Sequence, residues 1–310
     1  MNLEKALVTG GAGFIGSHLV DALVARGCGV TVLDDLSSGK RSNLEAVEGR
    51  IRFLEGDICD RDALQNAAAG CDTVFHMAAV VSVPWSVAHP TASARVNEMG
   101  TLNVLQAARA CGARRFVFSG SCAVYGDDDR VPKQEAMLPT PLSPYAVQKL
   151  ASEHYVALYL RLYGMETVNL RYFNVYGPRQ DPSSPYSGVI SIFMTRASQG
   201  RPAVIYGDGR QYRDFIFVQD VVAANLAAAT LPGASGHTLN VGTGHRTTVG
   251  RLWEMACALA DLQIEPQYAD PRPGDILASV ADVTSAGRWL KFQPAFSLQQ
   301  GLERTYRWYR

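Results

Sequence analysis

The sequence has few of the features that mark nucleic-acid-binding or membrane-spanning proteins. Lys and Arg together number 29, as do Asp and Glu, so the formal net charge is zero. A nucleic-acid partner, which usually requires a basic excess, is therefore not expected. No run approaches the roughly 18 apolar residues that would span a bilayer. The first apolar run, Ala6-Leu7-Val8, leads directly into glycines, so no secretory signal is predicted and we expect a cytoplasmic protein.

Cysteine pairs and metal-ligand clusters are also lacking. The chain has no CxxC pair and no group of His and Cys at ligand spacing. This pattern predicts reduced thiols in a cytoplasmic protein and no metal site. The six cysteines are Cys28, Cys59, Cys71, Cys111, Cys122 and Cys257.

What the chain does have is an alternation of strand and helix patterns over its first 120 residues. The expected strands are Lys5–Thr9, 30–33, 51–54, Thr73–His76 and 115–118, and the expected helices are Phe14–Ala25, 60–69 and 95–110. Strands that alternate with helices form a parallel sheet with helices on both faces. We therefore predict an α/β fold with a doubly wound parallel sheet of the Rossmann type.

The second half is less regular and predicts a smaller mixed α/β lobe. A helix is expected over Pro144–Tyr163, with proline well placed at its start, followed by strands at 166–171 and Thr238–Val241. The segment 177–185 is rich in Pro and Ser and predicts a functional loop. We expect the Rossmann lobe to comprise residues 1–175 and 217–243. The substrate-binding lobe would comprise residues 176–216 and 244–310.

Three glycines predict a dinucleotide site between the first strand and the first helix. Gly10, Gly13 and Gly16 form a GxxGxxG pattern, with Phe14 and Ile15 opening the helix. Glycine permits a tight turn and a close backbone approach to a pyrophosphate, which the helix N-terminus attracts. Glycines often serve turns alone, so the prediction depends on the strand–turn–helix order around them.

Two aspartates follow the next strands of the expected sheet. Asp34, which comes 18 residues after Gly16, would accept both hydroxyls of an adenosine ribose and repel a 2′-phosphate, which favours NAD over NADP. Asp57, in Gly56-Asp57-Ile58, is equally consistent with a contact to adenine and with a loop-capping role.

A YxxxK pair and a serine are the candidate catalytic residues. Tyr145 and Lys149 are four residues apart and would share one face of a helix. A nearby ammonium favours the phenolate of a tyrosine, which could then act as a general base toward a sugar hydroxyl. Ser121 lies just beyond the strand at 115–118, where ligands of open α/β sheets bind. Ser119 is a second candidate.

Together these motifs resemble the extended short-chain dehydrogenase/reductase family, and within it the nucleotide-sugar 4-epimerases. The resemblance covers nearly the whole chain. It rests on Gly10 to Gly16 and on the segments Ser121-Cys122-Ala123-Val124-Tyr125-Gly126, Tyr145-Ala146-Val147-Gln148-Lys149 and Arg171-Tyr172-Phe173-Asn174-Val175-Tyr176-Gly177. It implies an NAD-dependent enzyme that acts on a UDP-sugar.

The resemblance also implies roles for individual residues. Ser121, Tyr145 and Lys149 would be catalytic, and Lys149 would also hold the nicotinamide ribose. The implied cofactor-binding residues are Gly10, Gly13, Phe14, Ile15, Gly16, Asp34, Asp57, Ile58, Ala78, Asn97, Tyr145, Lys149 and Tyr172. The implied substrate-binding residues are Ser121, Asn174, Val189, Val204, Tyr206, Arg213, Arg272, Asp275 and Ser279. Of these, Arg213 and Arg272 would clamp the diphosphate, since guanidinium groups match phosphate oxygens.

The reaction implied by the resemblance is C4 epimerisation through a transient 4-keto sugar. Dehydratases of the family carry Thr-Asp-Glu, and decarboxylases a Glu, where this chain has Ser121-Cys122-Ala123, so neither reaction is expected. The alternatives are a net NAD-dependent oxidoreductase of a nucleotide sugar and a non-catalytic NAD-binding sensor. The intact catalytic set speaks against the sensor.

Two further expectations concern the sugar and the assembly. A residue shortly after the Arg-x-Gly-Asp segment forms a wall of the sugar pocket in this family, and alignment places Ser279 there. Its small size implies room for an N-acetyl group, and hence UDP-GlcNAc and UDP-GalNAc as substrates. The alternative is that Ser279 faces solvent at a strand end. The resemblance implies a homodimer through a four-helix bundle. Tyr155, Leu158, Tyr159 and Leu162 fit an apolar stripe buried in such a bundle, and packing within the core explains them equally well.

Overall fold

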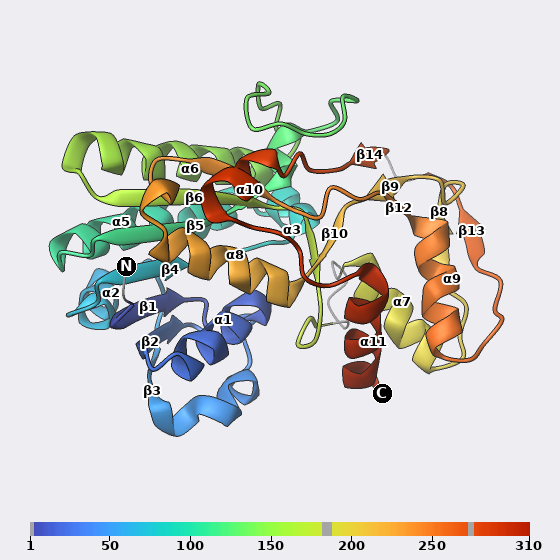
Figure 1. Ribbon diagram of the computed structural model, residues 1–310, viewed down its shortest axis with the longest axis horizontal. Helices are drawn as coiled ribbons and strands as arrows, with labels where there is room; N and C mark the ends of the chain where they lie inside the picture. Colours follow the sequence, from blue (N-terminus) through green and yellow to red (C-terminus); the bar gives the residue numbers. More distant parts are fainter. Residues whose placement is uncertain (1–2, 182–187, 272–275) are drawn as a thin grey trace.

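A seven-stranded, fully parallel sheet forms the centre of the larger lobe (Figure 1). The computed structural model describes residues 3–181, 188–271 and 276–310. The strand order is β11-β6-β5-β4-β1-β2-β3, and Thr9 lies opposite both Leu33 and His76. The predicted α/β fold is confirmed. The strands are β1 (Lys5–Thr9), β2 (Gly29–Asp34), β3 (Ile51–Glu55), β4 (Thr73–His76), β5 (Arg115–Ser121), β6 (Glu166–Tyr172) and β11 (Thr238–Val241).

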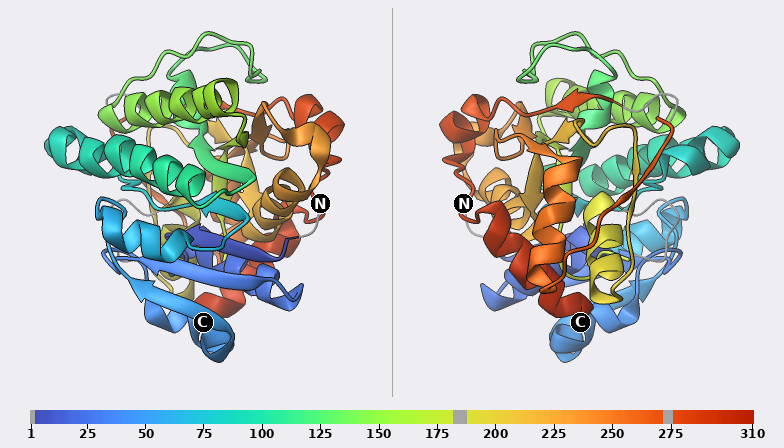
Figure 2. Two further views of the ribbon diagram at one scale, coloured as in Figure 1. Left: turned by 90° about the vertical axis from the view of Figure 1, so that its left-hand side faces the viewer. Right: turned by 90° about the vertical axis from the view of Figure 1, so that its right-hand side faces the viewer.

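Helices cover both faces of this sheet, as Figures 1 and 2 show. One face packs against α1 (Phe14–Ala25), α8 (Val218–Thr230) and α10 (Thr284–Leu290), and the other against α2 (Arg61–Ala68), α5 (Thr101–Ala110) and α6 (Pro144–Tyr163). Each face has its own hydrophobic core, because the strands bury apolar side chains on both sides. Leu7 and Val8, adjacent in β1, belong to different cores and are both fully buried.

Several short helical segments were not expected from the sequence. The helix predicted over 95–110 is divided into a π-helical stretch, η2 (Arg95–Gly100), and α5. Such π segments interrupt α-helices and often lie at functional sites. The other short segments are η1 (Arg41–Arg50), α3 (Val83–Ala88), α4 (Pro90–Ala94), η3 (Cys122–Tyr125) and η4 (Pro232–Ala234).

The smaller lobe lies beside the carboxyl ends of the central strands (Figure 1). Its core joins three helices around Phe193, Trp253 and Leu302, and it carries short strands in three small sheets of order β10-β7, β12-β9-β14 and β13-β8. The helices are α7 (Val189–Ser198), α9 (Val249–Leu259) and α11 (Leu298–Tyr309). The strands are β7 (Asn174–Tyr176), β8 (Val204–Tyr206), β9 (Tyr212–Arg213), β10 (Phe215–Phe217), β12 (Thr247–Thr248), β13 (Gln267–Ala269) and β14 (Ala278–Ser279).

The helix α10 lies within the range 244–310 that was predicted to belong to the smaller lobe, but it packs on the larger lobe. Ala286, Leu290 and Phe292 belong to the core of the larger lobe, and α10 packs against β11 and α8. The segment 244–310 therefore leaves the larger lobe, returns to it through α10, and ends in the smaller lobe with α11. The α10 sequence is too short for its apolar positions to reveal which lobe they face.

Three kinds of feature are absent from the part of the chain that the structure describes. Over residues 3–181, 188–271 and 276–310, no helix is long and apolar enough to cross a membrane. Within the same ranges, no group of three His, Cys, Asp or Glu side chains is arranged to hold a metal ion. The six cysteines are all free thiols.

A buried ion pair fastens α6 to the sheet. Two guanidinium nitrogens of Arg171 donate to the carboxylate of Glu153 in α6, Nη2 at 2.6 Å and Nε at 2.9 Å. The side chains of Arg171 and Glu153 are 4% and 8% exposed. The third nitrogen, Nη1, donates to the hydroxyl of Tyr125 at 2.9 Å. Because the two charges are removed from water, each depends on the other for its solvation.

We expect Glu153→Gln to lower the free energy of unfolding by about 3–5 kcal/mol, because it leaves the Arg171 charge buried without its counter-ion. The measurement is the urea unfolding midpoint of the purified protein. Glu254→Gln is the matched control, since Glu254 pairs with Arg251 on the surface at 2.8 Å and such exposed pairs contribute little. Equal losses in the two variants would contradict the role given to Glu153.

Candidate active site

The turn between β1 and α1 is built from glycines that leave no room for side chains. Gly10 has φ +69°, and a Cβ on it would lie 2.6 Å from the backbone nitrogen of Ala78. A Cβ on Gly16 would lie 2.1 Å from the carbonyl oxygen of Gly10. Gly13 precedes α1 without any side-chain cap for the first helical amides. These amides are donors without a partner inside the helix, so the turn fits a pyrophosphate.

Asp34 lies at the end of β2 with its carboxylate held in place. Its Oδ2 accepts a hydrogen bond from the Ala12 amide at 2.8 Å, and its Oδ1 accepts one from the Leu36 amide at 2.9 Å. Burial raises the pKa of Asp34, while these two amides lower it. Each carboxylate oxygen retains acceptor capacity, so Asp34 fits the two hydroxyls of a ribose.

Asp57 has loop-capping contacts and also lines a cavity. Its Oδ1 accepts from the Cys59 amide at 2.8 Å, and its Oδ2 pairs with Arg95 at 3.0 Å. This is the loop-capping arrangement. Asp57 also lines the cavity described next, together with Ile58, so the capping contact leaves it facing the space where an adenine would lie.

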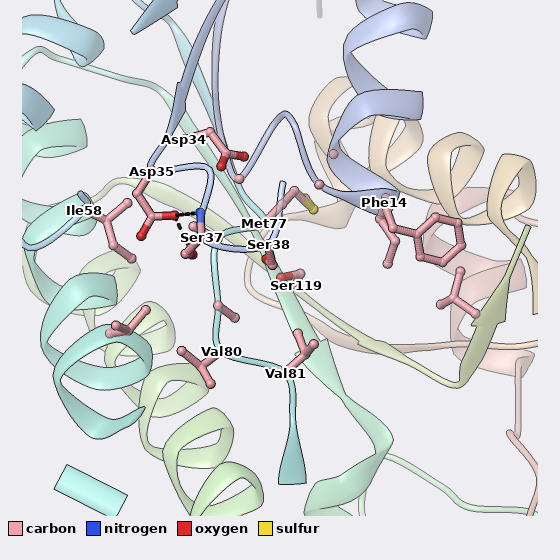
Figure 3. A pocket seen from close by; sticks show the side chains of 18 of the residues that line it. Phe14, Asp34, Asp35, Ser37, Ser38, Ile58, Met77, Val80, Val81 and Ser119 are labelled. Carbon is pink, nitrogen blue, oxygen red and sulfur yellow. Dashed lines mark hydrogen bonds between the residues drawn. The ribbon is translucent and has the colours of Figure 1, made fainter. Parts of the chain in front are cut away.

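One cavity of about 460 Å³ joins the glycine turn to the candidate catalytic residues. In Figure 3, Ile58 and Phe14 lie on opposite sides of it, with Asp34 and Ser119 between them. The cavity runs along the carboxyl ends of the strands, where ligands of such sheets bind. Of the residues predicted to bind cofactor, those that line it are Gly10, Gly13, Phe14, Ile15, Gly16, Asp34, Asp57, Ile58, Ala78, Tyr145, Lys149 and Tyr172.

Asn97 is placed differently from its prediction, because it does not line the cavity. It is buried behind the wall, where its Oδ1 accepts from the Val80 amide at 2.8 Å and its Nδ2 donates to the Val80 carbonyl at 3.0 Å. Nδ2 also donates to Gln148 Oε1 at 2.8 Å. Asn97 thus fixes Val80, which does line the cavity, to the helix that carries Tyr145. The sequence does not reveal this contact, because Asn97 and Gln148 are 51 residues apart.

Ser121, Tyr145 and Lys149 meet in the same cavity. Ser121 is the last residue of β5, and its hydroxyl shares a hydrogen bond with that of Tyr145. The Nζ of Lys149 donates to the Ser119 carbonyl at 2.9 Å and lies 4.9 Å from the centre of the Phe118 ring. Because the Ser119 hydroxyl donates instead to the His76 carbonyl at 3.0 Å, Ser121 is the serine that faces the tyrosine.

Burial dominates the electrostatics of this group. It raises the pKa of Tyr145 to about 12, against a small lowering by the Ser121 hydrogen bond. It lowers the pKa of Lys149 to about 7. Both shifts disfavour charge in a dry site. The start of α6 is held by a further contact, from the Tyr145 amide to Ser86 Oγ at 3.1 Å, which no sequence motif indicated.

Of the predicted substrate residues that the structure describes, Ser121 lines this cavity, whereas the others lie in the smaller lobe and do not line it. Asn174 begins β7, and Ser279 pairs with Arg213 across β14 and β9. Val189 begins α7, while Val204 and Tyr206 are the ends of β8. Arg272 and Asp275 lie outside the described residues.

Ser279 is buried rather than facing solvent. It is 8% exposed, and its hydroxyl hydrogen-bonds the thiol of Cys122, the residue after Ser121. Burial raises the pKa of that thiol to about 11, whereas Arg213 and Ser279 lower it. Ser279 and Arg213 are therefore neighbours of the turn that follows Ser121, although 158 residues separate Ser279 from Ser121 in the sequence.

The irregular segment after β7 contributes three residues to the wall of the cavity. Arg179, Gln180 and Asp181 line it. Arg179 pairs with Asp21 of α1 at 2.8 Å, and Asp181 pairs with Lys40 at 2.8 Å. The Pro and Ser content of this segment predicted a functional loop but not the two pairs, because Asp21 and Lys40 lie far away in the sequence.

Comparison with known proteins agrees with this geometry. Residues 6–242 match the family described as the NAD dependent epimerase/dehydratase family. A UDP-glucose 4-epimerase of Mycolicibacterium smegmatis is 41% identical over 310 residues, which cover 99% of this chain and 98% of that protein.

Two solved structures have nearly the same fold. The UDP-glucose 4-epimerase of Thermotoga maritima, solved with UDP-glucose, is 40% identical with a TM-score of 0.94 and covers 99% of this chain and 98% of its own. The UDP-N-acetylglucosamine 4-epimerase of Methanobrevibacter ruminantium, solved with UDP-N-acetylmuramic acid, is 39% identical with a TM-score of 0.95 and covers 100% and 99%. The chain therefore belongs to the NAD dependent epimerase/dehydratase family, within the extended short-chain dehydrogenase/reductases, and NAD is its cofactor.

Proposed function

We propose that this chain is an NAD-dependent 4-epimerase of UDP-hexoses. The observation that carries the proposal is that Ser121, Tyr145 and Lys149 share one cavity with Asp34 and the glycine turn. The residues that follow Ser121 are Cys122 and Ala123, neither of which is an acid able to eject a hydroxyl or assist loss of a carboxylate. The names of the relatives, which are 4-epimerases of UDP-glucose and UDP-N-acetylglucosamine, support the same reaction.

The residues that would hold NAD are those that fit it chemically. The glycine turn offers amide donors for the pyrophosphate, and Asp34 offers acceptors for the adenosine ribose. Lys149 would donate to the nicotinamide ribose. The chemistry that bound NAD would supply is reversible hydride transfer at C4 of the sugar.

In this proposal Tyr145 takes the proton from the C4 hydroxyl and later returns it. Ser121 donates a hydrogen bond to the same sugar oxygen and orients it. The Lys149 ammonium lies one helical turn from Tyr145 and favours the phenolate. Because burial holds the pKa of Tyr145 near 12, a positive charge nearby is needed before the tyrosine can act as a base at neutral pH.

The smaller lobe would hold the UDP moiety. Arg213 and Arg272 would bind the diphosphate as guanidinium forks, and Asp275 the uridine ribose. Asn174 would contact the phosphate region. The backbone of Val189, with Val204 and Tyr206, would hold the uracil. These roles follow from the family resemblance, and the burial of Ser279 beside Cys122 and Arg213 supports a sugar pocket at this point.

We expect the protein to convert UDP-GlcNAc to UDP-GalNAc without added reductant and without net NADH, as followed by NMR. Tyr145→Phe should lower this turnover at least ~100-fold, the usual scale of general acid–base catalysis, while NAD content stays unchanged. Tyr268→Phe is the control, because Tyr268 is exposed on β13. Stoichiometric NADH in the wild-type protein would indicate a dehydrogenase. Normal turnover in Tyr145→Phe would remove that residue from the mechanism.

We further propose that the substrates are acetylated sugars, UDP-GlcNAc and UDP-GalNAc, in preference to UDP-Glc and UDP-Gal. The support is the small size of Ser279 and its burial beside Cys122, the residue after Ser121. A side chain at this wall that fills the space beside C2 would exclude the N-acetyl group, and steric exclusion discriminates sharply.

Ser279→Tyr should accordingly abolish turnover of UDP-GalNAc while sparing turnover of UDP-Gal, because the phenol ring occupies the N-acetyl space. The measurement is the ratio of kcat/KM for the two sugars. Ser198→Tyr, at an exposed position of α7, is the control and should leave the ratio unchanged. Unaltered UDP-GalNAc turnover in Ser279→Tyr would show that Ser279 is not the wall.

We also propose that two copies associate through α5 and α6, giving a four-helix bundle. Tyr155, Leu158 and Leu162 project from α6 as exposed apolar side chains, whereas Tyr159 is buried within the chain. An amphipathic helix that keeps an apolar row exposed usually covers it with a partner.

Leu162→Lys should convert the dimer to a monomer, because it places a charge in the buried contact. Light scattering coupled to size-exclusion chromatography measures this directly. Leu138→Lys, on the exposed loop before α6, should leave the mass unchanged. A wild-type protein that elutes as a monomer would refute the proposed bundle.

A further inference from the structure

A fully buried carboxylate lies in the smaller lobe directly after Arg213. Asp214 has no exposed surface, and its side chain accepts four hydrogen bonds. Oδ1 accepts from the amide of Thr243 at 2.8 Å and from its hydroxyl at 2.6 Å. Oδ2 accepts from the Gly244 amide at 2.9 Å and from the Ala281 amide at 3.1 Å. A carboxylate can accept all four, since it has about four lone-pair sites.

The backbone of Asp214 makes a second set of contacts. Its carbonyl oxygen accepts from both the amide and the Nδ2 of Asn174, each at 3.1 Å. Its amide donates to the Ser279 carbonyl at 2.8 Å. Three segments that carry predicted substrate residues, those of Asn174, Arg213 and Ser279, therefore meet at this one residue.

The surroundings of the carboxylate are too tight for another group. A Cβ on Gly242 would lie 2.6 Å from Asp214 Oδ2, so the turn after β11 approaches it as closely as the backbone allows. Burial raises the pKa of Asp214, and the bonds from Thr243, Ala281 and Gly244 lower it. An amide side chain of the same shape would turn its NH₂ group toward two of these donors and lose two bonds.

We propose that Asp214 is a positioning residue for the nucleotide sugar, which it acts on through Arg213, Asn174 and Ser279. It fixes these three groups relative to one another and to the turn after β11, where the chain leaves the larger lobe. The inference rests on the proposed function and deepens it. Loss of the carboxylate weakens binding of the UDP-sugar, whereas NAD and the proton transfer by Tyr145 are unaffected, since Asp214 does not line the cofactor cavity.

A second buried aspartate provides a matched control. Asp220 is 2% exposed, and its carboxylate accepts from the amides of Ala295 at 2.8 Å and Phe296 at 3.3 Å. It ties α8 to the segment before α11, and among the described residues these hydrogen bonds reach no predicted substrate residue. Both aspartates stabilise the fold by accepting backbone hydrogen bonds, so a purely structural effect should appear in both variants.

The experiment compares Asp214→Asn with Asp220→Asn in the intact, NAD-loaded protein. The readouts are KM and kcat for UDP-GlcNAc, the dissociation constant of UDP by calorimetry, and bound NAD. For Asp214→Asn we expect KM and the UDP dissociation constant to rise at least ~10-fold, the loss of about 1.4 kcal/mol of binding free energy. We expect kcat to stay within about threefold and NAD to be retained. Asp220→Asn should keep the wild-type KM.

Thr243→Val keeps the proposal testable if Asp214→Asn does not fold, because it removes a single donor and should raise KM several-fold. The proposal is overturned if Asp214→Asn or Thr243→Val lowers kcat at unchanged KM, or if Asp220→Asn raises KM equally. The proposed epimerase activity is judged separately, from turnover by the wild-type protein. The UDP dissociation constant reports on positioning whatever that turnover is.

Discussion

The buried ion pair between Glu153 and Arg171 fixes how α6, the helix of Tyr145 and Lys149, lies on the sheet. Glu153 follows Lys149 by one helical turn and Tyr145 by two, so all three side chains leave the same face of α6. Arg171 lies in β6, opposite Gly120 of β5. Arg171 also holds Tyr125, which follows Ser121 by four residues. One guanidinium thus connects the helix that carries Tyr145 and Lys149 to the turn that carries Ser121.

Burial of the side chains in the same region controls their protonation. Tyr145 and Lys149 are buried, and the pKa of each is shifted toward the neutral form. His76, behind them in β4, is neutral for the same reason, with its pKa lowered to about 3. Charges that enter such a site act strongly, because little water screens them. A charge on Lys149 or on a bound molecule therefore acts strongly on Tyr145.

The sequence predicted those parts of the site whose residues lie close together along the chain. The glycine turn, Asp34 and the Tyr145–Lys149 pair are each defined by neighbours within a turn or two of the chain. The strand–helix alternation then places their elements at one edge of a parallel sheet. The position of Ser121 after a predicted strand made it a candidate, and the family resemblance added Ser279.

What the sequence did not predict depends on contacts between distant segments. Asn97 hydrogen-bonds Val80 and Gln148 behind the wall of the cavity. The helix α10 packs into the core of the larger lobe. Asp214 gathers bonds from residues 243, 244 and 281. Local periodicity cannot indicate such contacts, since a buried aspartate and an exposed one look alike in a sequence.

The order of the strands along the chain has a consequence for synthesis. β11 completes the sheet beside β6, but residues 173–237 lie between the two strands. At about 5–20 residues per second, the ribosome needs roughly 3–13 s to make that intervening segment. Throughout that time the hydrogen-bonding edge of β6 is open. Its side chains Val168 and Leu170, buried in the finished protein, can be covered by α8 only late in this interval and by α10 only after it. Open apolar edges pair with other chains. The nascent protein is therefore most prone to aggregate just before its last central strand emerges, and any truncation before residue 238 makes that state permanent.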